Sequence, residues 1–216
     1  MPPKAFPHLT PEQQSALYQQ RLDEDRTLIH ALQQAGVYID SIYDLVKQKG
    51  NYARAMPLLV KLLPTVSDAM VKQGIVRALG QKDAIGLAEE ALIHEFLAVP
   101  PDLLGGESLK WAIGNTLEII ASDKYAEQLI SLASDKQHGT SRQMLVVGLG
   151  KLKKSPQVVD ALILLLDDED VSGHAVIALG KLKALKAAPK LKQLQNDSKR
   201  WIRTEVNKAL RRMKIE

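Results

Sequence analysis

Residues 171–180 read VSGHAVIALG, with apolar side chains at Val171, Ala175 and Leu179. Positions four residues apart lie on one face of an α-helix, so this segment predicts an amphipathic helix. Four other segments have the same spacing, except that Ser141 occupies the first position of one of them, and their last apolar positions are Leu79, Leu117, Leu149 and Leu210. From Leu79 to Leu210 the successive leucines are 38, 32, 30 and 31 residues apart, which indicates an internal repeat.

A second set of amphipathic segments lies between these helices. Each has apolar residues at helical spacing and is bounded by Pro, Gly, Ser or Asp, which often start or end helices. The segments span residues 55–63, 84–99, 124–133, 156–166 and 187–195. Together the two sets predict an all-α array of helix pairs.

The N-terminal region has its own helix signal. Thr10-Pro11 followed by Gln13 favours a helix start, because threonine caps free amides and proline fits the first helical position. We expect a helix from there to about Gln34, with a partner helix over residues 37–47. The predicted organisation is one continuous domain, with capping helices over residues 1–50 and a repeat array over residues 51–216 that ends in a basic capping helix.

The repeat resembles a known family. Helix pairs of about 30 residues, an acidic turn, a hydrophobic residue followed by a basic one, and Ala-Leu-Gly are similar to the short HEAT repeats of phycobilisome-lyase-like proteins. The resemblance covers about residues 51–213 and is best over residues 56–80 and 158–180. It implies a right-handed α-solenoid of antiparallel helix pairs, in which the second helix of each pair lines the concave side.

Composition excludes several kinds of chemistry. The 216 residues include no cysteine, which excludes thiol nucleophiles, disulfides and iron–sulfur clusters. The first nine residues have no basic segment followed by an apolar one, and no apolar run approaches the roughly 18 residues of a membrane span. We therefore expect a cytoplasmic monomer without membrane contact.

Three candidate chemical motifs have simpler interpretations. Residues 168–173 match the first half of a calcium loop, but Leu179 stands where that loop requires glutamate, so we interpret them as a helix start. Gly150 and Gly180 precede lysines without the spacer of a phosphate loop, and we interpret them as helix ends and close-packing sites. The histidines lack zinc-site spacing; they are His8, His30, His94, His138 and His174. We expect no metal, no cofactor and no enzymatic activity, although a catalytic triad assembled in space stays open.

The helices that carry the leucines also predict a surface. Positions two and six residues after the first apolar residue point away from the core. The predicted partner-binding residues on this concave face are Gln73, Arg77, Trp111, Asn115, Gln143, Val147, Ile177 and Lys208, and Gly173 occupies one of the same positions. One aromatic residue among aliphatic, amide and cationic ones is typical of protein interfaces. Trp111 is either an exposed anchor or is covered by the loop at residues 100–106.

The end of the chain is basic. Residues 181–216 contain 12 Lys and Arg against three acidic residues, whereas the whole chain has a formal net charge of +4. The residues predicted to contact an anion, nucleic acid or an acidic protein surface are Lys199, Arg200, Trp201, Arg203, Arg211 and Arg212. The alternative is a solvated capping helix whose last cations favour the helix dipole.

The leading functional prediction is a non-enzymatic scaffold that presents its concave helices to a protein partner, as an adaptor, assembly factor or inhibitor. Two alternatives stay open. One is nucleic-acid binding through the basic end, as in HEAT-like DNA glycosylases. The other, implied by the resemblance alone, is a bilin lyase-like factor.

Overall fold

The computed structural model describes residues 9–47 and 52–215, and within these ranges every regular element is helical. The predicted lack of an export signal, His8 and the proposed boundary between residues 50 and 51 lie outside the described residues. The all-α prediction is confirmed for the described part of the chain.

Helix α1 (Pro11–Gln34) starts and ends where the sequence predicts. The Oγ1 atom of Thr10 accepts a hydrogen bond from the backbone N–H of Gln13 at 3.3 Å, and Gln13 Oε1 accepts one from the N–H of Thr10 at 2.9 Å. This reciprocal pair satisfies two backbone amides that the helix itself leaves free.

Helix α2 (Ile42–Lys47) is shorter than the predicted segment at residues 37–47. The carboxylate of Asp44 accepts hydrogen bonds from the backbone N–H groups of Asp40 and Ser41, at 3.3 and 3.0 Å. These bonds fix a turn at residues 40–41, so the helix begins only after it. Val37 and Ile39 are buried as part of an extended approach to that turn.

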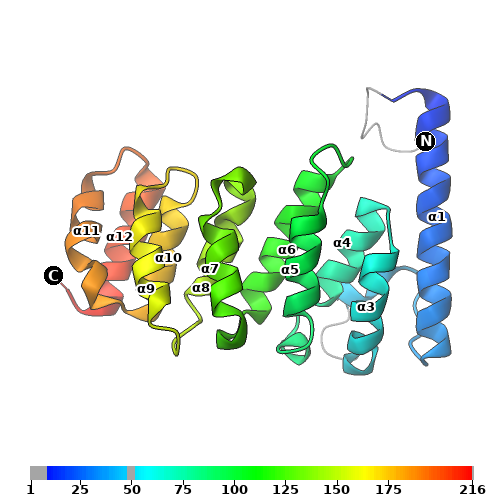
Figure 1. Cartoon of the computed structure of the whole chain (residues 1–216), viewed down its shortest axis with the longest axis horizontal. Helices are drawn as coiled ribbons and strands as arrows, with labels where there is room; N and C mark the ends of the chain where they lie inside the picture. Colours follow the sequence, from blue (N-terminus) through cyan, green and yellow to red (C-terminus); the bar gives the residue numbers. More distant parts are fainter. Residues whose placement is uncertain (1–8, 48–51, 216) are drawn as a thin grey trace.

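The other helices form two rows (Figure 1). The inner row holds the helices with the repeated leucines: α4 (Ala69–Ala78), α6 (Gly106–Ile120), α8 (Gln143–Leu149), α10 (Ser172–Leu182) and α12 (Arg200–Met213). The outer row comprises α3 (Met56–Leu62), α5 (Glu89–Ala98), α7 (Ala126–Ser134), α9 (Gln157–Leu164) and α11 (Ala188–Gln193). Short 3₁₀ turns extend several outer helices.

Helix α5 corrects the predicted helix at residues 84–99, because it begins at Glu89. Gly86 has a left-handed φ of 81°, which few residues other than glycine adopt readily, and this breaks the helix. The buried Glu89 carboxylate accepts a hydrogen bond from the N–H of Gly86 at 2.6 Å and one from the hydroxyl of Ser122 at 2.7 Å. Through Glu89, the turn before α5 is therefore linked by hydrogen bonds to Ser122, which follows α6 (Gly106–Ile120).

The rows pack differently. Each inner helix packs against the next, from α2 and α4 through to α12, whereas contacts between neighbouring outer helices are sparse, with α7 and α9 as the main exception. When neighbouring helices pack more closely in one row than in the other, the stack curves and the closely packed row lies on its concave side. The closer packing of the inner row favours a concave side lined by these helices, as the resemblance to HEAT repeats implies.

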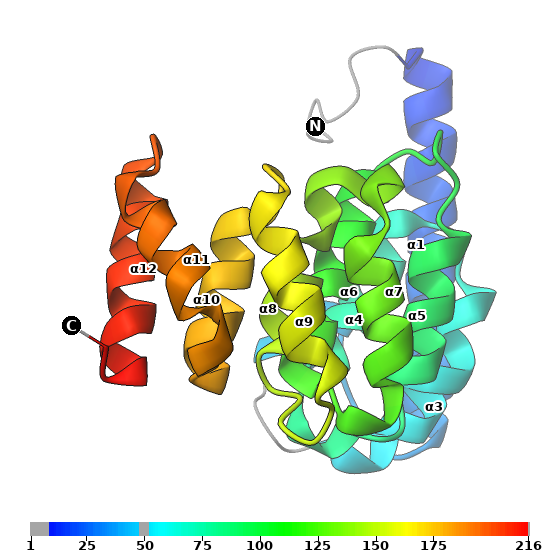
Figure 2. The ribbon, with the colours of Figure 1, turned by 60° about the vertical axis from the view of Figure 1, so that its left-hand side comes forward.

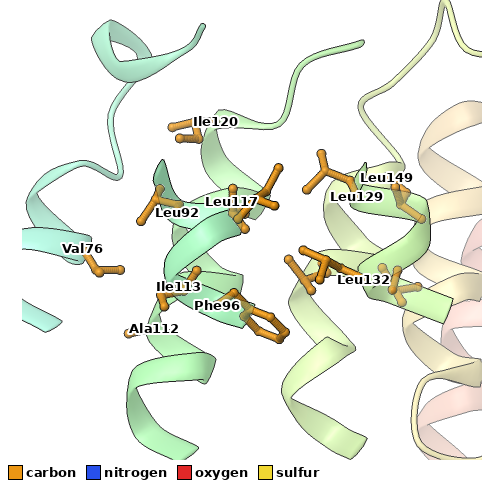
Figure 3. Packing of buried hydrophobic residues seen from close by; sticks show 14 of the residues in the cluster. Val76, Leu92, Phe96, Ala112, Ile113, Leu117, Ile120, Leu129, Leu132 and Leu149 are labelled. Atoms are coloured by element: carbon orange, nitrogen blue, oxygen red, sulfur yellow. The ribbon is translucent and has the colours of Figure 1, made fainter. Parts of the chain in front are cut away.

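One continuous core of mainly aliphatic side chains runs between the rows. Figure 3 shows Leu92 and Phe96 of α5 beside Ile113 and Leu117 of α6, with Leu129 of the next repeat close by. Fully burying an aliphatic side chain of this size stabilises the fold by about 1.5–3 kcal/mol. Because the core is aliphatic, the few exposed aromatic residues stand out as candidates for contact with a partner.

Glycine permits the close approach of α8 and α10. A Cβ atom on Gly150 would lie 2.8 Å from the Cα of Ala178, closer than two such carbons can approach. Gly150 also ends α8, so it is both a helix end and a packing site, as predicted. Gly180 lies within α10 and packs on Ala209 of α12, so its packing role is confirmed while α10 continues two residues beyond it.

The turn before α10 is held by a buried arginine. The side chain of Arg142 is fully buried and donates hydrogen bonds to the carbonyls of Ala133 and Gly139, and to Asp168 Oδ2 at 3.0 Å. Burial raises the pKa of Asp168, but hydrogen bonds from Arg142 and from the N–H of Asp170 outweigh it and hold this pKa below its usual range. These contacts agree with the interpretation of residues 168–173 as a helix start.

A related ion pair holds the start of the array. Asp68 caps α4 by accepting hydrogen bonds from the N–H groups of Met70 and Val71. Arg21 of α1 lies 3.2 Å from the Asp68 carboxylate, but its side chain is 29% exposed. The starts of α4 and α10 therefore each have an arginine paired with a buried aspartate, and this arginine is partly exposed at α4 and fully buried at α10.

Candidate functional site

Two hollows adjoin on the inner row between α4 and α6, and Arg77 lines both of them. The larger has a volume of about 650 Å³ and includes Asn115 and Ile119 in its lining. The smaller, of about 400 Å³, includes Gln73 and Trp111. We call the two hollows together the Trp111 groove.

Trp111 is 48% exposed. The guanidinium carbon of Arg77 lies 5.9 Å from the centre of the indole ring, a cation–π contact worth about 0.5–1 kcal/mol at an exposed site. No residue of the loop at residues 100–106 lines the hollow beside the ring, and about half of the surface of Trp111 is open to solvent. Trp111 is therefore an exposed aromatic side chain whose position is set by α6 and Arg77.

Asn115 lies one helical turn after Trp111. Its side-chain Nδ2 donates a hydrogen bond to the carbonyl oxygen of Trp111 at 3.0 Å. Within the described residues its Oδ1 makes no hydrogen bond. An amide fixed in this way presents an acceptor to a ligand in the larger hollow without further loss of side-chain freedom.

Two predicted surface residues are buried. Gln73 is 5% exposed and Val147 is 6% exposed, so the prediction that their positions point away from the core is wrong for them. Each inner helix packs against neighbours on both sides, which leaves only a narrow strip exposed. Gln73 still borders the smaller hollow, whereas Val147 lines neither hollow.

The remaining concave-face residues do not form one site. Gln143 donates a hydrogen bond to the carbonyl of Asp170 at 3.0 Å, which joins α8 to the turn before α10. Ile177 on α10 is half-buried and Lys208 on α12 is exposed, and neither lines the Trp111 groove. The structure thus brings together Gln73, Arg77, Trp111 and Asn115 from the predicted set.

Trp201 has a packing role that the sequence did not indicate. A Cβ on Gly173 would lie 2.0 Å from a ring carbon of Trp201, so the indole rests directly on the backbone of α10. The centre of the ring is 5.5 Å from that of His174, and the side chain is 46% exposed. Gly173, predicted to face a partner, is covered by this ring.

The predicted anion-binding residues are divided by the length of α12. Lys199, Arg200 and Arg203 lie at its start, while Arg211 and Arg212 lie at its end, about 15–20 Å away at 1.5 Å per residue. Arg203 donates hydrogen bonds to the carbonyls of Asp197 and Ser198 at 2.6 and 3.0 Å, so it holds the turn before the helix. The structure does not bring this set together as one patch.

The sequence analysis missed residues that complete the larger hollow. Tyr52 donates a hydrogen bond to the carbonyl of Ala78 at 3.0 Å and accepts one from Gln81, and burial raises the pKa of Tyr52. Gln81 and Ile119 each stand two residues after a repeated leucine. This shared position could have been recognised in the sequence, and it predicts that both residues lie at the edge of the inner row.

Neither a metal site nor a membrane helix was found in the described part of the chain. No group of three or more His, Asp or Glu side chains there is placed to hold a metal ion. No helix there combines the length and the hydropathy needed to cross a bilayer.

Comparison with known proteins supports the helical repeat. Residues 109–211 match the sequence model of the HEAT repeats, a stretch that includes most of α6 and extends into α12. Among solved structures, the crystal structure of an engineered protein is similar, with a TM-score of 0.51 and 18% identity, over 89% of this chain and 96% of that one. This likeness concerns the fold alone. A search of the curated proteins found no match.

Proposed function

Because residues 109–211 are HEAT repeats, as the sequence resemblance indicated, we propose that the chain is a non-enzymatic scaffold that holds a partner protein in the Trp111 groove. HEAT repeats are a typical protein-binding module. The observation that carries the proposal is the half-exposed indole of Trp111 in the smaller hollow, beside Arg77, which lines both hollows.

The chemistry of the groove suits a protein ligand. Tryptophan and arginine are the residue types that most often carry binding energy at protein interfaces, and here Arg77 lies over Trp111. Both side chains stand on helices whose backbones are fixed by the core, so little conformational freedom is lost on binding. Ala112 and Ile119 add apolar surface to the larger hollow, which Arg77 also lines.

The test is partner capture from native lysate with the immobilised full chain. We expect Trp111→Ala to lose the specific partner, because truncating such an anchor costs roughly 2 kcal/mol or more. Circular dichroism should show unchanged helical content, since the ring is half exposed.

Tyr38→Ala is the matched control, because Tyr38 is 80% exposed and lies outside the groove. This variant should retain the partner. Equal recovery of the same partners by the wild type, Trp111→Ala and Arg77→Ala would refute binding in the groove.

The two alternatives have weaker support. Nucleic-acid binding by the predicted basic set requires its members to act together, and the length of α12 separates Lys199 and Arg200 from Arg211 and Arg212. A bilin lyase-like role rests on the resemblance alone, and no geometry described above selects a pigment.

A further inference from the structure

The last three repeats carry cations at equivalent positions in or just after the last turn of each inner helix. These positions follow the repeated leucine by two and four residues. The cations are Lys151, Lys153, Lys181, Lys183, Arg212 and Lys214, all of them exposed, and we call them the basic edge. In the first two repeats the same positions hold Gln81, Asp83, Ile119 and Ala121.

The fold places these cations along one edge of the array. The turns that follow α8 and α10, and the end of α12, all lie toward the lower edge in Figure 2. Packed helices are about 8–10 Å apart, so the cations recur at about that spacing and extend over roughly 20 Å. The basic edge is a linear feature, unlike the scattered cations of α12 considered above.

A carboxylate already occupies one gap between repeats. Glu118 Oε1 lies 3.7 Å from the Nζ atom of Lys151 and 3.0 Å from that of Lys181. Lys151 also donates a hydrogen bond to the carbonyl of Ile119, which closes the end of α6. Cations of adjacent repeats are therefore spaced so that one protein carboxylate pairs with both.

The next gap lacks such an acid. The residue equivalent to Glu118 in the following repeat is Gly150, which has no side chain. Arg212 extends toward this gap, because its Nη1 lies 3.7 Å from where a Cβ on Gly180 would stand. Lys181 and Arg212 thus repeat the arrangement around Glu118 without a carboxylate from the chain itself.

Two cations of the basic edge occupy a conformation that disfavours lysine. Lys183 and Lys214 have φ values of 53° and 59° and are the positive-φ residues other than glycine in the described ranges. They end α10 and α12, where glycine is the favoured residue. The chain therefore carries positive charge at both helix ends although glycine would give a more stable fold.

We propose that the basic edge binds an acidic segment of a partner protein, with an Asp or Glu carboxylate between Lys181 and Arg212. The proposal rests on the proposed scaffold function and names the chemistry of the partner. Glu118 favours a protein carboxylate as the occupant, since it shows one bound between equivalent cations. None of the six positions holds an aromatic residue on which a base would stack.

The test measures fluorescence anisotropy of a labelled peptide of ten glutamates titrated with the full chain at low salt. We expect Lys181→Gln/Arg212→Gln to weaken binding about tenfold and Glu118→Gln to tighten it about threefold. The opposite signs arise because the first variant removes the cations and the second releases them from an internal carboxylate. Binding of the wild type should weaken as salt rises.

Lys61→Gln/Lys192→Gln is the matched control, because it removes the same charge from exposed positions on outer helices α3 and α11. An equal loss of affinity in this control would overturn the proposal, as would unchanged affinity in Lys181→Gln/Arg212→Gln. A duplex DNA oligonucleotide that binds more tightly than the peptide at the same residues would reassign the basic edge to phosphates.

Three further variants separate the hypotheses. Trp111→Ala should leave peptide affinity unchanged, so failure of the groove and failure of the basic edge give different results. Lys183→Gly and Lys214→Gly should each raise the Tm by about 2–4 °C while weakening peptide binding. A higher Tm with unchanged affinity would remove these two lysines from the site.

Discussion

The first two inner helices of the array differ from the last three. Between α4 and α6 the surface opens into the Trp111 groove, with a half-exposed indole and mixed polar side chains. From α8 to α12 the helices approach one another closely at Gly150 and Gly180, and the ring of Trp201 contacts the backbone at Gly173. Repeats with the same apolar pattern can therefore either leave a groove between their inner helices or pack them closely, and a few residues outside that pattern decide which.

The two tryptophans show this most directly. Trp111 and Trp201 are exposed to similar extents, 48% and 46%. The ring of Trp111 contacts the side chain of Arg77, whereas the ring of Trp201 rests on the backbone of α10 at Gly173. Similar exposure therefore accompanies opposite roles, one available to a partner and one joining two helices.

The largest expected contrast concerns the two arginine–aspartate pairs. Arg142→Met should lower the free energy of unfolding by about 3–5 kcal/mol, because it leaves the buried Asp168 carboxylate without its cation. Arg21→Met should cost less, about 1–2 kcal/mol, because water reaches the site of the partly exposed Arg21 and the buried Asp68 carboxylate keeps its backbone hydrogen bonds at the start of α4. Urea denaturation of both variants measures the difference. Similar losses would show that burial does not distinguish the two regions.

A smaller contrast is expected at two inner-row glycines. Gly173→Ala should destabilise the chain by about 1–3 kcal/mol, because the new methyl group displaces the ring of Trp201. Gly114→Ala should be close to neutral, since its Cβ would meet the Ser141 carbonyl at 3.3 Å and alanine favours the helix.

Tryptophan fluorescence provides a second measurement for these variants. In a Trp111→Phe background the signal comes from Trp201 alone, because the chain has two tryptophans. Gly173→Ala should shift that emission to longer wavelength as the ring enters water, and Gly114→Ala should not. An unshifted spectrum in Gly173→Ala would mean that the contact adjusts without exposing the ring.

The smallest effect concerns pH. Burial lowers the pKa of His174 beside Trp201, and burial together with Lys110 lowers the pKa of His138. The unfolded chain therefore binds more protons than the folded chain below about pH 6.5. The two neutral histidines contribute their full stability above that pH, and the free energy of unfolding falls as the pH decreases below it. Comparing urea denaturation at pH 7.5 and 5.5 measures this loss.

Single substitutions identify the source of the pH effect. His174→Gln and His138→Gln should each reduce the loss of stability between pH 7.5 and 5.5. The exposed His94→Gln is the control and should keep the dependence of the wild type. If the three variants keep the same dependence, the buried histidines are not its cause.

The sequence predicted the helix pairs well because a period of four within each segment and a period near 30 between segments both depend on local spacing. Thr10 and Gln13 similarly located the start of α1. The start of α5 was missed because it depends on Glu89 reaching Ser122 of the following repeat. Such a contact leaves no periodic signal.

The candidate site was predictable only in part. Helical spacing predicted that Trp111, Arg77 and Asn115 share one face, and the structure places each of them in the lining of the Trp111 groove. The burial of Gln73 and Val147 was missed, because it depends on how closely neighbouring helices approach. Gly173 beneath Trp201 was missed for the same reason, as the two residues belong to different repeats.

The unequal packing of the two rows has a mechanical consequence. Spreading the outer helices breaks few contacts, whereas separating the inner helices breaks a continuous seam. The inner row therefore resists stretching, while the outer helices can move apart or together. We expect the array to bend most easily in the plane of its own curvature. A partner whose surface is flatter or more curved than the inner row would be accommodated by changes in the distances between outer helices. The distances between inner helices would change least.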